Sequence, residues 1–79
     1  MTDLVSGAQM RAARGILKWS IADLEKQSGV SSMTIKRMER GDGVPSARDE
    51  NIQAVYNAFI SSGRIRFEGE DVVQIVFEE

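Results

Sequence analysis

The sequence contains neither cysteine nor histidine, and these absences exclude much catalytic and metal-binding chemistry. Without thiols there is no disulfide framework and no zinc–thiolate site, and without imidazoles a common metal ligand and acid–base catalyst is missing. The carboxylates also show no pairing that indicates a catalytic cleft. We therefore expect no enzymatic activity, no cofactor, no metal and no small-molecule ligand.

Long apolar segments are missing as well. No run approaches the roughly 18 residues that a membrane helix needs, and the N-terminus MTDLVSGAQM lacks a basic region followed by an apolar one. We expect a cytoplasmic protein without a membrane segment. Its 79 residues predict a single domain over residues 1–79, whose one core is marginal in isolation, so dimerisation would stabilise it.

Charges of opposite sign are separated along the chain, although the net charge is only −2. Residues 7–48 carry eight basic and four acidic side chains, a balance of +4. Residues 49–79 carry two basic and seven acidic side chains, a balance of −5. This separation indicates a basic working face and an acidic back. A mixed, solvated surface explains the same charges equally well.

Helical periodicity and capping residues predict a helical part over residues 6–62. A serine precedes each of four expected helices: Ser6 before residues 7–17, Ser20 before 21–27, Ser31 before a helix that reaches Arg40, and Ser46 before a helix that stops at 61–63. Gln9 completes a capping box with Ser6. Gly29 permits the positive φ of a sharp turn between the second and third helices.

Two apolar faces are expected to form most of the core. On the first helix the predicted face consists of Ala8, Ala12, Ile16 and Leu17. On the fourth helix it consists of Ile52, Val55, Tyr56, Phe59 and Ile60. Trp19, between the first two helices, is interpreted as a packing residue at the core or its rim.

The C-terminal part changes to the alternating pattern of strands, which predicts a β-hairpin over residues 64–77 with its turn at residues 69–71. Such a hairpin is marginal unless it packs against something. Its exposed edge invites pairing with a second copy of the chain, so we expect a dimer interface. The apolar candidates for this interface are Val72, Val73, Ile75 and Phe77.

The most specific pattern is two short helices joined by the Gly29 turn. Inward-facing positions are Leu24, Val30, Ile35 and Met38, and outward-facing positions are Ser32, Met33, Lys36, Arg37 and Arg40. The words MRAARGILKWS, ADLEKQSGVSSMTIKRMERG and VPS…NIQAVYNAFISSG resemble the Cro/CI-type helix-turn-helix family, also called the xenobiotic-response-element family. The ending GRIRFEGEDVVQIVF looks like the β-hairpin of one bacterial branch of that family.

The resemblance implies a mainly α, lambda-repressor-like bundle of four or five helices with the third helix in the major groove of DNA. Ser32, Met33, Lys36 and Arg37 match the base-reading positions. Lys36 or Arg37 can donate to guanine, and Met33 can pack on a thymine methyl group. Two alternatives stay open: the basic pair contacts only phosphates, or Met33 belongs to the core.

The resemblance also implies a phosphate clamp at the N-terminus of the second helix. There, backbone N–H groups and a polar side chain hold the DNA backbone. Ile21 stands where the family usually has glutamine, so that contact is lost, and Ile21 is alternatively a packing residue against Val5 or Leu4. The remaining phosphate contacts are expected from Lys18, Ser20, Ser31 and Arg40.

Arg14 and Glu39 match an ion pair between the first and third helices of several family members. Such a pair would hold the third helix in its orientation. The alternative is two unrelated surface charges.

These patterns favour a sequence-specific regulator of transcription that binds double-stranded DNA as a homodimer, and a repressor in particular. One recognition helix reads only a few base pairs, and two-fold pairing doubles the site. The alternative is an antitoxin-like or anti-repressor module that keeps the fold but binds another protein. Ile21 and the acidic tail favour this alternative mildly.

Overall fold

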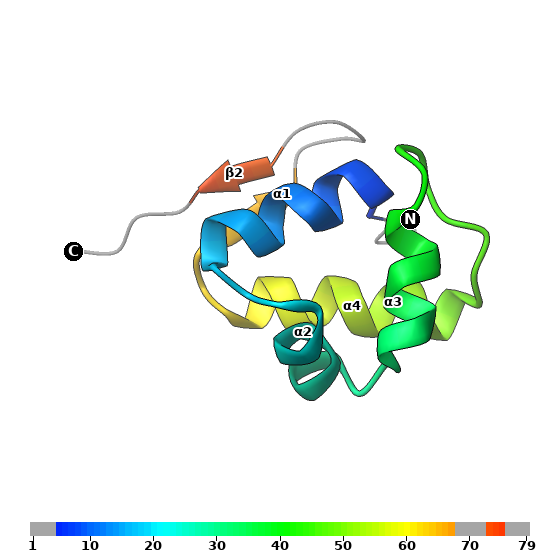
Figure 1. The fold of residues 1–79 in the computed structure, drawn as a ribbon. Coiled ribbons are helices and arrows are strands. Elements are labelled where there is room, and N and C mark those ends of the chain that lie inside the picture. The colour runs from blue at the N-terminus through cyan, green and yellow to red at the C-terminus, as the bar shows by residue number, and fades with distance from the viewer. Residues whose placement is uncertain (1–4, 68–72, 76–79) are drawn as a thin grey trace.

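The computed structural model describes residues 5–67 and 73–75 of the chain. In these ranges it is mainly α, as predicted, with four helices followed by two short strands (Figure 1). The elements are α1 (Gly7–Leu17), α2 (Ile21–Ser28), α3 (Ser32–Glu39), α4 (Asp49–Ser61), β1 (Ile65–Phe67) and β2 (Val73–Ile75). Helix α2 packs against both α3 and α4, while α1 contacts α3.

Three of the four predicted serine caps are confirmed. The Ser6 hydroxyl accepts from the Gln9 backbone N–H at 3.0 Å, and the Gln9 side chain accepts from the Ser6 N–H at 2.9 Å. Ser20 caps α2 and Ser31 caps α3. Each cap satisfies backbone N–H groups that the first helical turn leaves without a partner.

The prediction of the fourth cap is wrong, because Ser46 does not cap α4. The helix begins at Asp49 after Arg48, which has extended backbone angles and no side-chain cap. A tight turn, in which the Ala47 N–H donates to the Pro45 carbonyl at 3.1 Å, places Ser46 ahead of the helix. Two acidic residues in the first turn, Asp49 and Glu50, complement the positive end of the helix dipole.

The predicted buried face of α1 is also corrected. Ala12 is exposed, and Ala8, Ile16 and Leu17 are half-buried. Met10 and Ala13 are fully buried instead. Apolar residues occur nearly all round this helix, and alanines discriminate weakly between faces. The contacts with α3 and β2, rather than the apolar pattern, therefore decide which side is covered.

Aromatic stacking organises the core around Phe59, which is fully buried. Trp19 stacks on Phe59 with ring centroids 5.7 Å apart, and Phe67 of β1 meets it edge-on at 5.9 Å. Trp19 is therefore a packing residue, as predicted. Along α4, Ile52 and Val55 are buried as expected and Tyr56 is half-buried, whereas the prediction is wrong for Ile60, which is 36% exposed.

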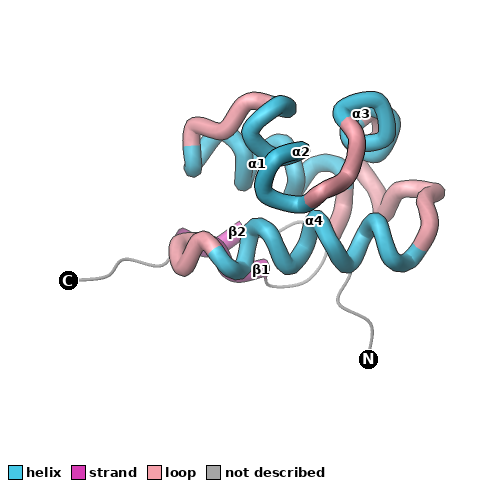
Figure 2. Tube along the Cα trace, turned by 90° about the horizontal axis from the view of Figure 1, so that it is seen from below, coloured by secondary structure: helices cyan, strands magenta, loops and turns pink. Residues whose placement is uncertain are grey.

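The two strands pair antiparallel, with Ile65 opposite Ile75 and Phe67 opposite Val73. Strand β1 lies beside α4, and β2 lies beside α1. The expected turn at residues 69–71 lies outside the described residues. In both Figure 1 and Figure 2 the strand pair and α3 occupy opposite ends of the described structure.

Candidate nucleic-acid interface

The segment from α2 to α3 folds as two helices around a left-handed glycine. Gly29 has φ 78° and donates its N–H to the Glu25 carbonyl at 2.8 Å. Four apolar residues anchor the segment in the core, as predicted: Leu24, Val30, Ile35 and Met38. Both helices are thereby fixed to the body of the domain, and the opposite side of α3 is left in solvent.

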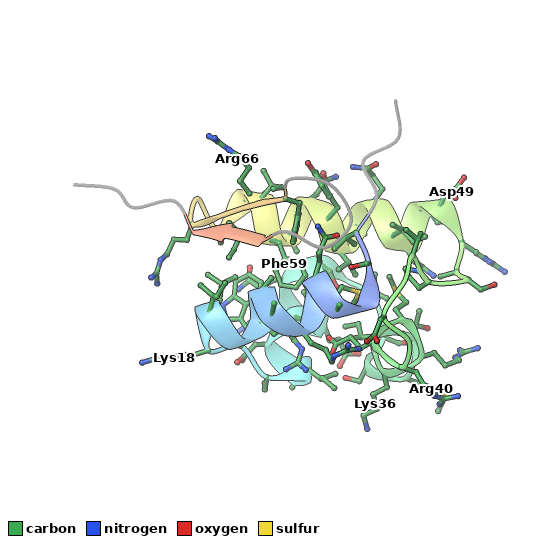
Figure 3. The ribbon with its side chains drawn as sticks, turned by 90° about the horizontal axis from the view of Figure 1, so that it is seen from above. Lys18, Lys36, Arg40, Asp49, Phe59 and Arg66 are labelled. Carbon is green, nitrogen blue, oxygen red and sulfur yellow. The ribbon has the colours of Figure 1, made fainter. Side chains whose placement is uncertain are left out.

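The solvent side of α3 is basic. Lys36, Arg37 and Arg40 are exposed, and Figure 3 shows Lys36 and Arg40 projecting outward from the helix. Met33 is 71% exposed, which excludes the alternative that it belongs to the core. An exposed helix face with three cations and one flexible apolar side chain has the size and chemistry to enter a DNA major groove.

Hydroxyl groups at the start of α3 already have partners. Ser31 accepts from the Thr34 N–H at 3.3 Å and donates to the Thr34 hydroxyl at 3.0 Å. The half-buried Ser32 donates to Oε1 of Glu25 at 2.7 Å. Sequence reasoning missed Glu25, because it lies on α2 and approaches Ser32 only through the folded turn.

At the start of α2, Ser20 is exposed and forms a capping box with Asp23. Its hydroxyl accepts from the Asp23 N–H at 3.0 Å, and its own N–H donates to the Asp23 carboxylate at 2.9 Å. Because the hydroxyl accepts this bond, it can still donate its own proton to a phosphate. Ile21 is half-buried and packs against the core cluster.

A bidentate ion pair joins α1 to the end of α3. Nε and Nη2 of Arg14 each donate to a Glu39 carboxylate oxygen at 2.7 Å, and Nη1 donates to the Trp19 carbonyl at 3.0 Å. Glu39 is only 7% exposed. Hydrogen bonding to Glu39 raises the pKa of Arg14, while the partial burial of the Arg14 side chain opposes that shift.

A second arginine of α1 binds the same end of α3, and sequence reasoning missed it. Arg11 donates to the carbonyls of Glu39 and Gly41 and pairs with the Asp42 carboxylate. The backbone N–H of Gly7 donates to the Gly43 carbonyl at 2.9 Å. The last carbonyl groups of a helix attract a cation, because they form the negative end of the helix dipole. Together these contacts hold the C-terminal end of α3 against α1.

A cleft separates α3 from the start of α4. Its lining residues are Thr34, Arg37, Met38, Ser46, Ala47, Arg48, Glu50 and Asn51. Arg37 thus lies at the border between the solvent side of α3 and this cleft, where a second guanidinium, that of Arg48, is also found. This position is compatible with a base contact and with a phosphate contact.

Lys18 stands apart from the cations of α3. Figure 3 shows it at the C-terminal end of α1, pointing away from Lys36 and Arg40. It closes α1 with left-handed backbone angles, φ 59° and ψ 36°. Among the described residues it is the only non-glycine with a positive φ.

We expect Lys18→Gly to raise the free energy of unfolding by about 0.5–1 kcal/mol, because glycine adopts the left-handed region without steric cost. The same variant should weaken DNA binding if Lys18 contacts a phosphate. Denaturant unfolding and DNA titration measure the two effects. Lys18→Ala is the matched control, since it removes the charge but keeps the strain. Equal stability of the two variants would contradict the strain argument.

The remaining predicted residues are those of the expected dimer interface. Val72 and Phe77 lie outside the described residues, and for Val73 and Ile75 the structure describes the backbone pairing alone. Within residues 5–67 and 73–75, no helix has the length and apolarity to cross a membrane. The same part of the chain holds no cluster of three or more potential His, Cys, Asp or Glu metal ligands.

The chain was compared with known protein families. A helix-turn-helix family model matches residues 10–49, slightly more than half of the chain, and confirms the resemblance predicted from the sequence. The matched region covers most of α1, all of α2 and α3, and the loop that follows. Comparisons with curated proteins and with solved structures gave no match.

Proposed function

This chain belongs to the Cro/CI-type helix-turn-helix family, and we propose that it is a sequence-specific repressor that reads double-stranded DNA with α3. The family implies DNA binding and transcriptional regulation. The proposal adds a lambda-repressor-like docking mode, in which α3 lies in the major groove. It also implies action in the cytoplasm, at the nucleoid.

The observation that carries the proposal is the basic solvent side of a firmly held α3. Lys36, Arg37 and Arg40 supply charge for phosphates and donors for base edges. Arg11 and Arg14 hold the end of the same helix against α1. Because α3 is held rigidly, the side chains that contact bases keep their positions relative to the groove. Recognition of a few base pairs requires this precision.

Selection of binding sites from random DNA by the intact chain tests the proposal. We expect enrichment of one short motif that recurs as an inverted repeat. Failure to enrich any motif would contradict sequence-specific binding.

Phosphate contacts are proposed at the start of α2 and α3. Ser20 offers a hydroxyl proton there, and Arg40 projects from the far end of α3. Ser31 lies at the N-terminus of α3, and because its hydroxyl donates to Thr34, the proposed contact there is through backbone N–H groups. Ile21 packs against the core instead of replacing the glutamine contact. The clamp therefore depends on backbone N–H groups and on Ser20.

Arg37→Ala is expected to weaken binding to the preferred site by about 1–3 kcal/mol and to relax preference at one base pair. The reason is that alanine removes a donor pair suited to guanine. Fluorescence titration with the preferred duplex and with single-base variants measures both effects. Arg48→Ala, on the far side of the cleft, is the matched control. If Arg37→Ala weakens all duplexes equally, Arg37 contacts a phosphate.

The proposed homodimer forms through the strands, with Val72, Val73, Ile75 and Phe77 at the interface. Since the strand pair and α3 lie at opposite ends (Figure 2), such a dimer carries its two α3 helices on its outer ends. That arrangement suits half-sites one or more helical turns apart. Sedimentation equilibrium should therefore give a dimer at micromolar concentration. A monomer both alone and on DNA would contradict this interface.

A second candidate function is an antitoxin-like or anti-repressor module that binds another protein. Glu25 beside the start of α3 and Ile21 in place of a phosphate contact favour it. DNA retention at low salt separates the two functions, because a module that binds only protein retains none.

A further inference from the structure

The hydrogen bond between Glu25 and Ser32 decides which atoms the start of α3 offers to its surroundings. It joins α2 to the first residue of α3, and the Ser32 hydroxyl donates to Oε1 of Glu25 at 2.7 Å. Ser32 retains partial exposure, and Glu25 is exposed. In helix-turn-helix proteins the N-terminal residues of the recognition helix contact base edges.

A serine hydroxyl has one proton and two acceptor lone pairs, whereas an ionised carboxylate only accepts. With its proton committed to Glu25, Ser32 presents lone pairs alone. A hydrogen bond to a carboxylate is also roughly twice as strong as one to a neutral acceptor. A neutral base oxygen or nitrogen therefore competes poorly for the Ser32 proton.

We infer that Ser32, positioned by Glu25, recognises an exocyclic amino group in the major groove. Such a group is N6 of adenine or N4 of cytosine, whereas O6 and N7 of guanine and O4 of thymine only accept. This inference rests on the proposed function, since it names the base chemistry read at that site. Ser32 makes the contact, and Glu25 is a positioning residue.

The rival arrangement is direct reading by Glu25, because a carboxylate also accepts from N4 of cytosine. The two arrangements differ in whether the effect of Glu25 on base preference requires Ser32. If Glu25 acts through Ser32, its removal has no effect on base preference once Ser32 is alanine. If Glu25 reads the base itself, its effect persists in that background.

The test uses the intact chain and the duplex selected from random DNA. The position read by Ser32 is the base pair whose preference Ser32→Ala flattens. There, single groups are deleted: purine for adenine or 2-pyrimidinone for cytosine removes the amino group, and 2-aminopurine for guanine or 5-methyl-2-pyrimidinone for thymine removes the keto oxygen. Affinities of wild type and Ser32→Ala for these duplexes form double-mutant cycles.

We expect deletion of the amino group to weaken wild-type binding roughly 3- to 10-fold and Ser32→Ala hardly at all, while deletion of the keto oxygen affects both proteins equally. Glu25→Ala should reduce the coupling of Ser32 to the amino group. It should also create coupling of Ser32 to the keto oxygen, since it frees the Ser32 proton. In the Ser32→Ala background, Glu25→Ala should change no base preference. Gln27→Ala, another exposed residue of α2, is the matched control.

Coupling of Ser32 to the keto oxygen in wild type would overturn the inference. So would a Glu25→Ala variant whose only effect is a uniform change in affinity, or a Glu25 effect that persists without Ser32. These outcomes leave DNA binding intact and are thus distinguishable from failure of the proposed function, which would appear as failure to select any duplex.

Discussion

Gly7→Ala is expected to lower the free energy of unfolding by about 2–3 kcal/mol, although alanine is the better helix former. A β-carbon at residue 7 would lie 2.1 Å from the Gly41 carbonyl oxygen and 2.8 Å from that of Met38. Both obstacles are backbone atoms, so no side-chain rotation relieves the clash. The end of α3 must move away from α1, and the Gly7–Gly43 hydrogen bond at 2.9 Å is disturbed with it.

Gly15→Ala in the same helix is the matched control. No atom lies within 4 Å of a β-carbon added there, so alanine should stabilise the protein by about 0.5–1 kcal/mol. Denaturant unfolding of the two variants gives shifts of opposite sign. If both variants gain stability, α1 and the end of α3 are not in the close contact described. Gly7→Ala should also reduce DNA affinity, whereas Gly15→Ala should not.

Arg14→Ala is expected to lower the free energy of unfolding by about 2–4 kcal/mol, because it leaves the Glu39 carboxylate buried without its cation. Glu39 is 7% exposed, and Arg14 makes both of the hydrogen bonds to its carboxylate described above. For a domain of this size, each kcal/mol corresponds to about 4–8 °C in Tm. Thermal and denaturant unfolding both measure the loss.

The pair Arg48–Glu50 provides the comparison. Its atoms are 3.6 Å apart, and both side chains are more than 70% exposed, so Arg48→Ala should change stability by less than about 0.5 kcal/mol. The double variant Arg14→Met/Glu39→Leu should recover much of the loss, since it leaves no charge buried. Equal, small effects of Arg14→Ala and Arg48→Ala would show that the Arg14 pair is not a structural link.

Local signals in the sequence predicted the helical part well. Ser6 with Gln9, Ser20 and Ser31 are caps, and Gly29 is the left-handed turn, because short-range geometry alone decides such positions. The predicted cap at Ser46 was wrong, although it rested on the same kind of local signal. A turn at Pro45 displaced the start of α4, and no local pattern distinguishes a serine at a cap from a serine two residues too early.

Contacts between distant segments were less accessible to sequence reasoning. The expectation for Arg14 and Glu39 came from family resemblance, whereas the contacts of Arg11 with the end of α3 and of Glu25 with Ser32 were not expected at all. Each depends on how two helices are placed relative to one another. The predicted buried face of α1 was wrong at Ala12 for the same reason, since packing against α3 and β2 selects the face.

DNA binding by the solvent side of α3 is tested by the affinity of the intact chain for the selected duplex as a function of salt concentration. We predict that log K falls linearly with log salt, with a slope of about −0.9 for each phosphate neutralised. The combined variant Lys36→Ala/Arg40→Ala should make that slope shallower. Absence of DNA retention at low salt, or a slope unchanged in the variant, would show that this side of α3 does not bind the DNA backbone.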